Sequence, residues 1–159
     1  MMQNSRKRQT GQCFVELATG LIAIIPVILF SMDLYVLYMG ASLNDTVCGA
    51  AARAASSGAP DAVNPGEPLR RAQGVAFKAN HLAGAVEMHP QNVTVAENIV
   101  SLPPGIYGGP VDGQITVTSS VKVYPPFLLS IMSGPQGLTF TTSKTMPYTW
   151  SMQSTPQKQ

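Results

Sequence analysis

The longest apolar stretch of the chain runs from Leu17 to Leu43 and constrains the fold more than any other feature. Its 27 residues contain one charged side chain, that of Asp33. As an α-helix with a rise of about 1.5 Å per residue, the stretch is about 40 Å long, which exceeds the ~30 Å hydrocarbon core of a bilayer. The rest of the 159-residue chain is too small to surround such a helix. The sequence therefore predicts one transmembrane helix and one small domain.

The charges around this stretch orient it in the membrane. Arg6, Lys7 and Arg8 precede the stretch, and no basic cluster follows it directly. By the positive-inside rule, we expect the N-terminus in the cytoplasm and the C-terminal domain outside, with membrane lipid as a partner. Residues 12–159 carry 7 basic and 8 acidic side chains, a sum of −1, so a nucleic-acid partner is not expected.

The helical pattern continues beyond the span. Small and apolar residues recur at alternating steps of four and three up to about Ala55, which predicts an extended helix with one packing face. The helical pattern ends at Ser56, Ser57, Gly58 and Pro60. Pro26 either bends the helix for a functional purpose or makes a harmless kink. Asp33 either pairs with a basic residue of a neighbouring chain or reaches water at the outer interface. The residues of the expected packing face, besides Pro26 and Asp33, are Val36, Leu43, Val47, Ala50 and Ala54.

The C-terminal part reads as an α+β domain. Residues 69–88 have the apolar period of an amphipathic helix, and the runs 93–95, 115–123 and 138–150 alternate as strands do. We expect this helix to pack on an antiparallel sheet of about three strands, with residues 103–113 as a loop. Residues 127–132 form either an exposed contact patch or a short buried segment that closes the core. The predicted organisation is a basic leader (1–11), the long helix (12–57), a linker (58–68), the domain (69–153) and a tail (154–159).

No candidate catalytic, cofactor or metal site emerges from the sequence, so an enzyme is not expected. Four titratable residues form no recognisable acid–base or metal-ligand pattern and are interpreted as surface residues: His81, His89, Glu87 and Glu97. Cys13 and Cys48 lie 35 residues apart on one predicted helix, too far for a disulfide within the chain. Cys48 either bridges to another copy or serves as a small packing residue.

The junction between the basic leader and the span carries the most specific signal. Glu16 is the fifth residue after Gly11 and stands at the start of the apolar helix. A carboxylate on a membrane helix is costly and is normally paired. One interpretation is that Glu16 is solvated or paired with Arg8 at the cytoplasmic interface.

In this junction the chain resembles prepilins, and more closely the TadE-like pseudopilins of tight-adherence (Tad, or Flp) pilus systems. The resemblance extends to Pro26, Asp33, the run Ala50-Ala51-Ala52-Arg53-Ala54-Ala55 and, loosely, the C-terminal strands. It implies that a prepilin peptidase cuts after Gly11, which makes Gln12 the mature N-terminus. The new α-ammonium group at Gln12 is then the alternative partner for the Glu16 carboxylate.

The resemblance also implies a role for the chain. That role is a minor structural subunit of a type IVb-like pilus or of its assembly platform in the bacterial inner membrane. The partners would be other pilins and pseudopilins, and the subunit would support pilus assembly and surface adhesion. Residues 59–159 carry only 11 charged side chains in 101 residues, which suits a domain that buries surface against other subunits. The alternative is an unprocessed, single-span binding or adhesion module of the cell envelope.

Overall fold

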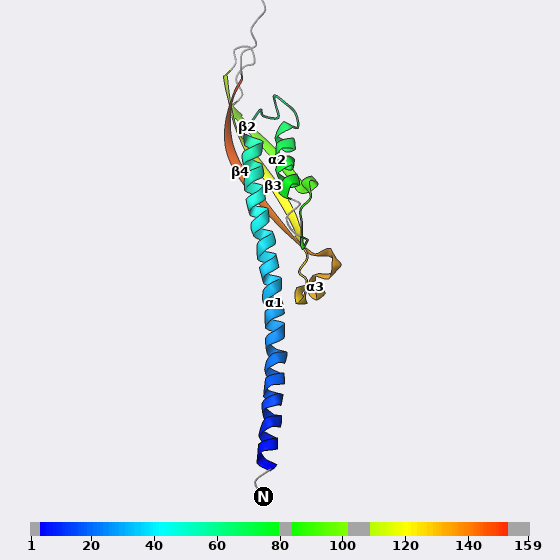
Figure 1. Ribbon diagram of the computed structural model, residues 1–159. Coiled ribbons are helices and arrows are strands. Elements are labelled where there is room, and N and C mark those ends of the chain that lie inside the picture. The colour runs from blue at the N-terminus through cyan, green and yellow to red at the C-terminus, as the bar shows by residue number, and fades with distance from the viewer. Residues whose placement is uncertain (1–3, 80–83, 102–108, 153–159) are drawn as a thin grey trace, which may run out of the picture.

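The computed structural model describes residues 4–79, 84–101 and 109–152, and it has the predicted α+β architecture. One helix, α1 (Asn4–Ser56), forms a rod of 53 residues, about 80 Å long at the usual helical rise. A small head packs on the C-terminal half of this rod, while the N-terminal half projects away from it (Figure 1). The start of α1 and the end of the last strand lie at opposite ends of the molecule.

The head is built on an antiparallel sheet whose centre is the long strand β3 (Gly109–Val123). β4 (Leu138–Met152) pairs with β3 along its whole length, from Gly109 opposite Met152 to Val123 opposite Leu138. The other edge of β3 is shared by β2 (Val93–Ser101) and the two-residue strand β1 (Val86–Glu87). The sheet thus contains four strands but is three strands wide.

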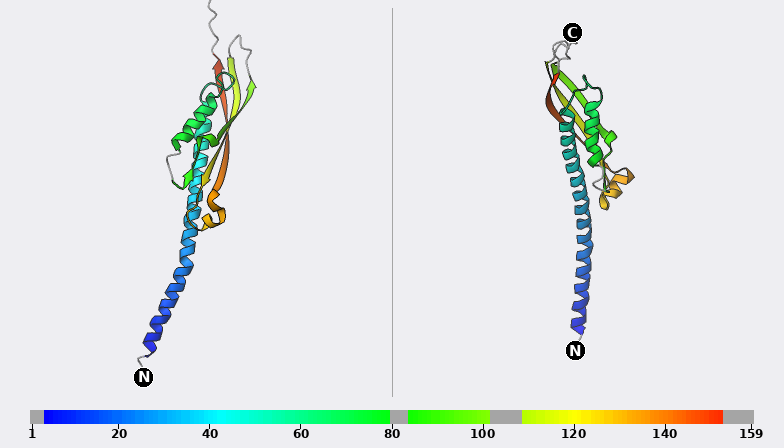
Figure 2. Two further views of the ribbon diagram at one scale, coloured as in Figure 1. Left: turned by 90° about the vertical axis from the view of Figure 1, so that its right-hand side faces the viewer. Right: turned by 45° about the horizontal axis from the view of Figure 1, so that its top comes forward.

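One face of the sheet is buried and the other is not, as the alternation of side chains in β3 requires. The inward residues of β3 include Val111, Ile115, Val117 and Val121, and all are buried in a single core. The C-terminal half of α1 and the short helix α2 (Glu67–Ala79) cover this face (Figure 2). Alanines of both helices complete the core, because their small side chains let the backbones approach closely: Ala51, Ala52, Ala55, Ala72 and Ala76.

The order of the helices and strands agrees with the sequence prediction, but several boundaries were wrong. The second helix ends at Ala79 and not at Met88, because residues 86–87 pair with β3 as a strand. β3 begins at Gly109, within the predicted loop 103–113. The predicted tail 154–159, residues 80–83 of the predicted helix and residues 103–108 of the predicted loop lie outside the described residues.

Pro26 does not interrupt α1. The helix includes Pro26 and continues from Asn4 to Ser56 with only gentle curvature in Figure 1. Proline lacks the N–H that would bond to the carbonyl four residues earlier, so one helical hydrogen bond is missing here. Membrane helices tolerate such a gap.

Three short helical segments complete the described fold. The 3₁₀ turn η1 (Pro90–Asn92) leads from β1 into β2. The connection from β3 to β4 contains α3 (Leu128–Ser133) and the 3₁₀ turn η2 (Gly134–Gln136). This connection runs beside α1 in the direction of the rod's free end (Figure 1).

Gly40 marks the closest approach between α1 and the sheet. A Cβ atom at this position would lie 2.3 Å from the Cγ2 of buried Val123, whereas a Cβ at Gly74 on α2 would meet nothing within 4 Å. Alanine at Gly74 should stabilise the head by about 0.5–1 kcal/mol through helix propensity alone. Alanine at Gly40 gains the same propensity but overpacks the core, so we expect a net loss of about 1 kcal/mol.

The comparison is made by urea unfolding of the full chain in detergent micelles. Combining Gly40→Ala with Val123→Ala should cost less than the sum of the two single changes, because the overlapping methyl group is then absent. Equal stabilisation by Gly40→Ala and Gly74→Ala would contradict the close approach.

Candidate membrane-anchoring and assembly region

The N-terminal half of α1 is an apolar rod that is largely exposed, and near its inner end Val27 and Ile28 face the residues that precede α3. Within the described residues, α1 from Gln12 onward is long and apolar enough to cross a membrane, and none of its most apolar 18-residue window is buried inside the protein. Phe14 and Ile22 are 76% and 73% exposed. A core helix of a soluble domain would be covered, whereas this one offers its whole circumference to an apolar environment. The described part of the chain therefore has one candidate membrane span.

Hydroxyl groups along this rod are satisfied within the helix. The Thr19 hydroxyl donates to the Val15 carbonyl at 2.8 Å, and the Ser31 hydroxyl donates to the Val27 carbonyl at 2.7 Å. An unsatisfied polar group in hydrocarbon is costly, and these local bonds remove that cost. The rod is thus compatible with a bilayer at its polar positions as well as at its apolar ones.

Asp33 is fully buried, which differs from both expectations for this residue. One carboxylate oxygen accepts the backbone N–H of Phe127 at 2.9 Å, and the other accepts the N–H of Leu129 at 2.8 Å. The carboxylate neither reaches water nor remains available to a basic residue of another chain. Its partners are two N–H groups at the start of α3, which lack acceptors within their own helix. Asp33 therefore ties the β3–β4 connection to α1.

The predicted processing signal lies at the free end of the rod. The backbone of residues 4–11 belongs to α1, so Gly11 is part of the same continuous helix as the span. Gln12 and Glu16 are both exposed, and the Gln12 side-chain amide donates to the Glu16 carboxylate at 3.4 Å. The side chains of Arg6, Lys7 and Arg8 lie outside the part that the structure describes. Gln12 and Glu16 are thus on one face of α1, four residues apart.

The packing face of α1 beyond the span is partly the expected one. Val47 is buried, and Val36 and Leu43 pack against the core. Ala50 and Ala54 are half-buried and are not among the residues that pack against the core. The buried alanines are Ala51, Ala52 and Ala55, together with Cys48 and Asn44.

Asn44 is the main polar contact between α1 and the sheet, and the sequence analysis missed it. Its side-chain amide donates to the carbonyl of Phe140 and the hydroxyl of Thr142, both at 3.1 Å, and to the carbonyl of Ser119 at 3.4 Å. The Ser119 hydroxyl donates back to the Asn44 oxygen at 2.8 Å. A polar residue four positions after Gly40, on the same apolar face, was a signal that could have identified it.

Cys48 lies beside this contact and is fully buried. Its thiol faces the carbonyls of Val117 and Thr142 at 3.3 and 3.4 Å. A disulfide to another copy is therefore incompatible with the folded head, and the residue serves as a small packing group. Cys13 is exposed on the rod.

Of the four titratable residues considered for chemistry, the structure brings Glu87 and His89 together, while Glu97 has other partners. Glu87 is half-buried, accepts the Tyr124 hydroxyl at 2.9 Å and pairs with His89 Nε2 at 2.7 Å. The hydrogen bond from Tyr124, followed by that from His89, holds the pKa of Glu87 below its ordinary value, and the same bond raises the pKa of Tyr124. This cluster joins β1 to the end of β3.

Glu97 is likewise held by structural partners. Its carboxylate accepts the Tyr148 hydroxyl and, at 2.7 Å, the backbone N–H of Asp61. Burial and this hydrogen bond raise the pKa of Tyr148. Glu87 and Glu97 are therefore half-buried residues with structural partners, which differs from the surface interpretation, while His89 is exposed. His81 lies outside the described residues.

No group of three or more potential metal ligands occurs among the described residues. Instead, the region combines an exposed apolar helix segment, a carboxyl group near the start of that segment, and the β3–β4 connection, which is anchored where the exposed segment ends. Comparisons with protein-family models, curated proteins and solved structures gave no match to the chain.

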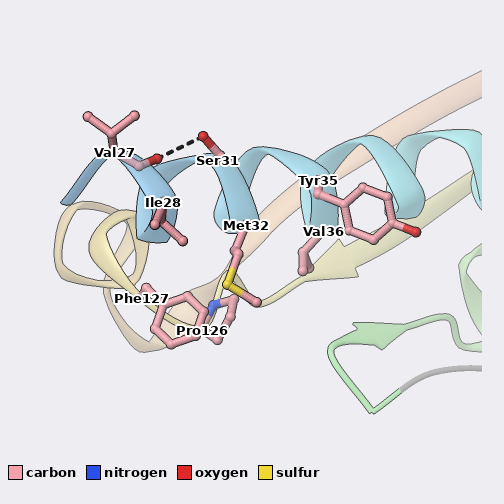
Figure 3. A pocket seen from close by; sticks show the side chains of 8 residues that line it. All are labelled: Val27, Ile28, Ser31, Met32, Tyr35, Val36, Pro126 and Phe127. Atoms are coloured by element: carbon pink, nitrogen blue, oxygen red, sulfur yellow. Dashed lines mark hydrogen bonds between the residues drawn. The ribbon is translucent and has the colours of Figure 1, made fainter. Parts of the chain in front are cut away.

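An apolar groove lies where the rod meets the head. Its volume is about 550 Å³, and it runs between α1 and the residues that precede α3. Ile28 and Met32 point from α1 toward Pro126 and Phe127 on the opposite wall (Figure 3). Val27, at the end of the groove farthest from the head, lies six residues, or about 9 Å of helix rise, before Asp33.

Proposed function

We propose that this chain is a TadE-like minor pseudopilin, a structural subunit of a Tad-type pilus or of its assembly platform. The observation that carries the proposal is the continuity of α1. An exposed carboxyl group, Glu16, stands five residues after Gly11 at the start of an uncovered apolar helix, and that helix runs unbroken into an α+β head. A subunit of this design needs a free helix for the membrane and for packing against other subunits, and a head at the other end.

The charge pattern supports the orientation of the subunit. Basic residues at positions 6–8 would stay in the cytoplasm, and the head would lie outside. A prepilin peptidase acting after Gly11 would then create an α-ammonium group at Gln12. In the uncut helix, the Gln12 amide already lies beside the Glu16 carboxylate, so the new charge would arise one helical turn from a carboxyl partner.

Cleavage after Gly11 is tested by producing the chain in cells with and without a prepilin peptidase. We expect a shorter product only with the active peptidase, and Gly11→Leu should remain full-length. Gly20→Leu is the matched control, because Gly20 lies in the same helix and a Cβ there would meet nothing within 4 Å. It should be cut like the unaltered chain.

Two results would count against the proposal. A product of unchanged length in the presence of the active peptidase would favour an unprocessed, membrane-anchored binding or adhesion module. Equal cutting of Gly11→Leu and the unaltered chain would place the processing site elsewhere.

A further inference from the structure

The connection between β3 and β4 exposes apolar side chains at an unusual place. Ile131 and Met132 on α3 are 81% and 83% exposed, and Phe127 and Leu128 are more than one-third exposed. Residues 123–143 contain no Asp, Glu, Lys or Arg. The segment at 127–132 is therefore the exposed contact patch that the sequence left as one of two possibilities, and it does not close the core.

The position of α3 along the rod is fixed by direct contacts. Asp33 binds the N–H groups of Phe127 and Leu129, and Phe127 shares the groove with Val27 and Ile28. The exposed patch thus lies beside the middle third of the apolar stretch, on the side of the head (Figure 1). A patch elsewhere on the head would not lie beside the membrane span.

The depth of this contact follows from helix geometry. If the hydrocarbon core begins near Glu16, about 20 residues of α1 cross it, and it ends near Val36. The half of the bilayer nearest the head then contains Val27, Ile28 and Met32. An element held against these residues is in contact with lipid acyl chains.

We propose that α3 and the residues before it insert into the bilayer leaflet that faces the head, and that a phospholipid acyl chain occupies the groove beside Phe127. This proposal rests on the membrane span of the proposed function and not on cleavage after Gly11. Interfacial segments of this kind bury their apolar side chains about 5–10 Å into the boundary between headgroups and acyl chains. Ile131 and Met132 are the side chains covered by lipid.

The contacts of Asp33 fit this location. A short helix at a membrane surface must satisfy the N–H groups of its first turn without relying on water. Asp33 accepts one N–H just before α3 and one within its first turn. Since these bonds also satisfy the carboxylate, neither polar group faces lipid without a partner.

A second copy of the chain is the competing occupant. Lipid is favoured because one wall of the groove is the span itself, so any occupant lies at bilayer depth, where acyl chains are the prevailing neighbours. The lining residues are apolar apart from the Ser31 hydroxyl, which is bonded to Val27, and that of Tyr35. The groove therefore offers almost no polar group for specific pairing with another chain.

The test is depth-dependent fluorescence quenching in vesicles of phosphatidylethanolamine and phosphatidylglycerol that contain a lipid with a quencher on its acyl chain. The full chain carries Cys13→Ser, so that the other native thiol is that of buried Cys48. A bimane label is attached at Met132→Cys, at Ile24→Cys in the span, or at Val100→Cys on β2. The three native side chains are 83%, 55% and 70% exposed, so labels there should leave the fold unchanged.

We expect Met132→Cys to lose fluorescence to the acyl-chain quencher nearly as much as Ile24→Cys, with no loss at Val100→Cys. Quenching at Ile24→Cys but not at Met132→Cys would overturn the proposal. Contact between labels at Met132→Cys on two chains, without lipid quenching, would also overturn it and identify a second copy as the occupant. Absence of quenching at Ile24→Cys would overturn the span itself, whether or not Gly11 is cut.

Discussion

Replacing Asn44 by leucine should destabilise the head by about 3–4 kcal/mol and loosen it from the rod. The change keeps the number and branching of the side-chain heavy atoms but removes the amide that bonds to Phe140 and Thr142 and the oxygen that accepts the Ser119 hydroxyl. Ser119 is buried, and each buried polar group left without a partner costs about 1–3 kcal/mol. Urea unfolding of the full chain in detergent micelles, followed by the fluorescence of its single tryptophan, Trp150, measures the loss.

The same substitution at an exposed asparagine provides the control. Asn98 on β2 is exposed, and Asn98→Leu should change stability by less than about 0.5 kcal/mol. Adding Ser119→Ala to Asn44→Leu should recover part of the loss, because the unpaired hydroxyl is then removed. A small loss for Asn44→Leu, equal to that for Asn98→Leu, would mean that this contact does not join the rod to the head.

Replacing Arg71 by methionine should cost about 2–3 kcal/mol. The Arg71 guanidinium donates to the carbonyls of Ala54, Ala55 and Ala59 at 3.0, 2.8 and 3.0 Å. These carbonyls lie in the last turn of α1 and just beyond it, where helical carbonyls lack partners and where a positive charge is favourable. Methionine keeps the aliphatic contacts but removes these three hydrogen bonds, and of the three carbonyls that of Ala54 still accepts the Ser57 hydroxyl, so α2 should be held less tightly to the end of α1.

Arg70 is the matched control for Arg71. It is adjacent in sequence but lies on the solvent side of α2, with a side chain that is 79% exposed and a bond to Glu67 alone among the described contacts. An exposed ion pair of this kind contributes about 0–1 kcal/mol, so Arg70→Met should have little effect. If the two substitutions had equal effects in urea unfolding, the cap on α1 would not be the source of Arg71's contribution.

Features that depend on local pattern could be predicted from the sequence. The apolar stretch predicted the span, and alternating residues predicted the three long strands, because both patterns report which side chains avoid water. The end of α2 could not be predicted in this way. Residues 80–88 keep a helical apolar period, but Val86 and Glu87 gain strand partners in β3, at Val123 and Lys122. Tertiary pairing outweighs helix propensity there.

Contacts between residues that are distant in sequence could not be predicted from the local pattern either. Asp33 meets backbone groups 94 and 96 residues further along the chain, and no periodicity encodes such a contact. The face of α1 at residues 50–55 is ambiguous for another reason. Five of its six residues are alanine, so hydrophobicity does not distinguish Ala50 and Ala54 from the buried Ala51 and Ala55.

The two ends of α1 therefore have separate tasks. Its C-terminal half is covered by α2 and the sheet, and Asn44 joins it to β3 and β4. Its N-terminal half is uncovered and carries Gly11 and Glu16 where the apolar stretch begins. In the proposed pseudopilin, the C-terminal half of α1 would supply a rigid head outside the cell. The N-terminal half would supply the membrane anchor and the contacts to other subunits.

The measurement that tests the central claim most directly is the intact mass of the mature chain, purified from membranes of cells with an active prepilin peptidase. We expect the mass of residues 12–159, with Gln12 as the first residue on sequencing. A mass that still includes residues 1–11 would contradict it.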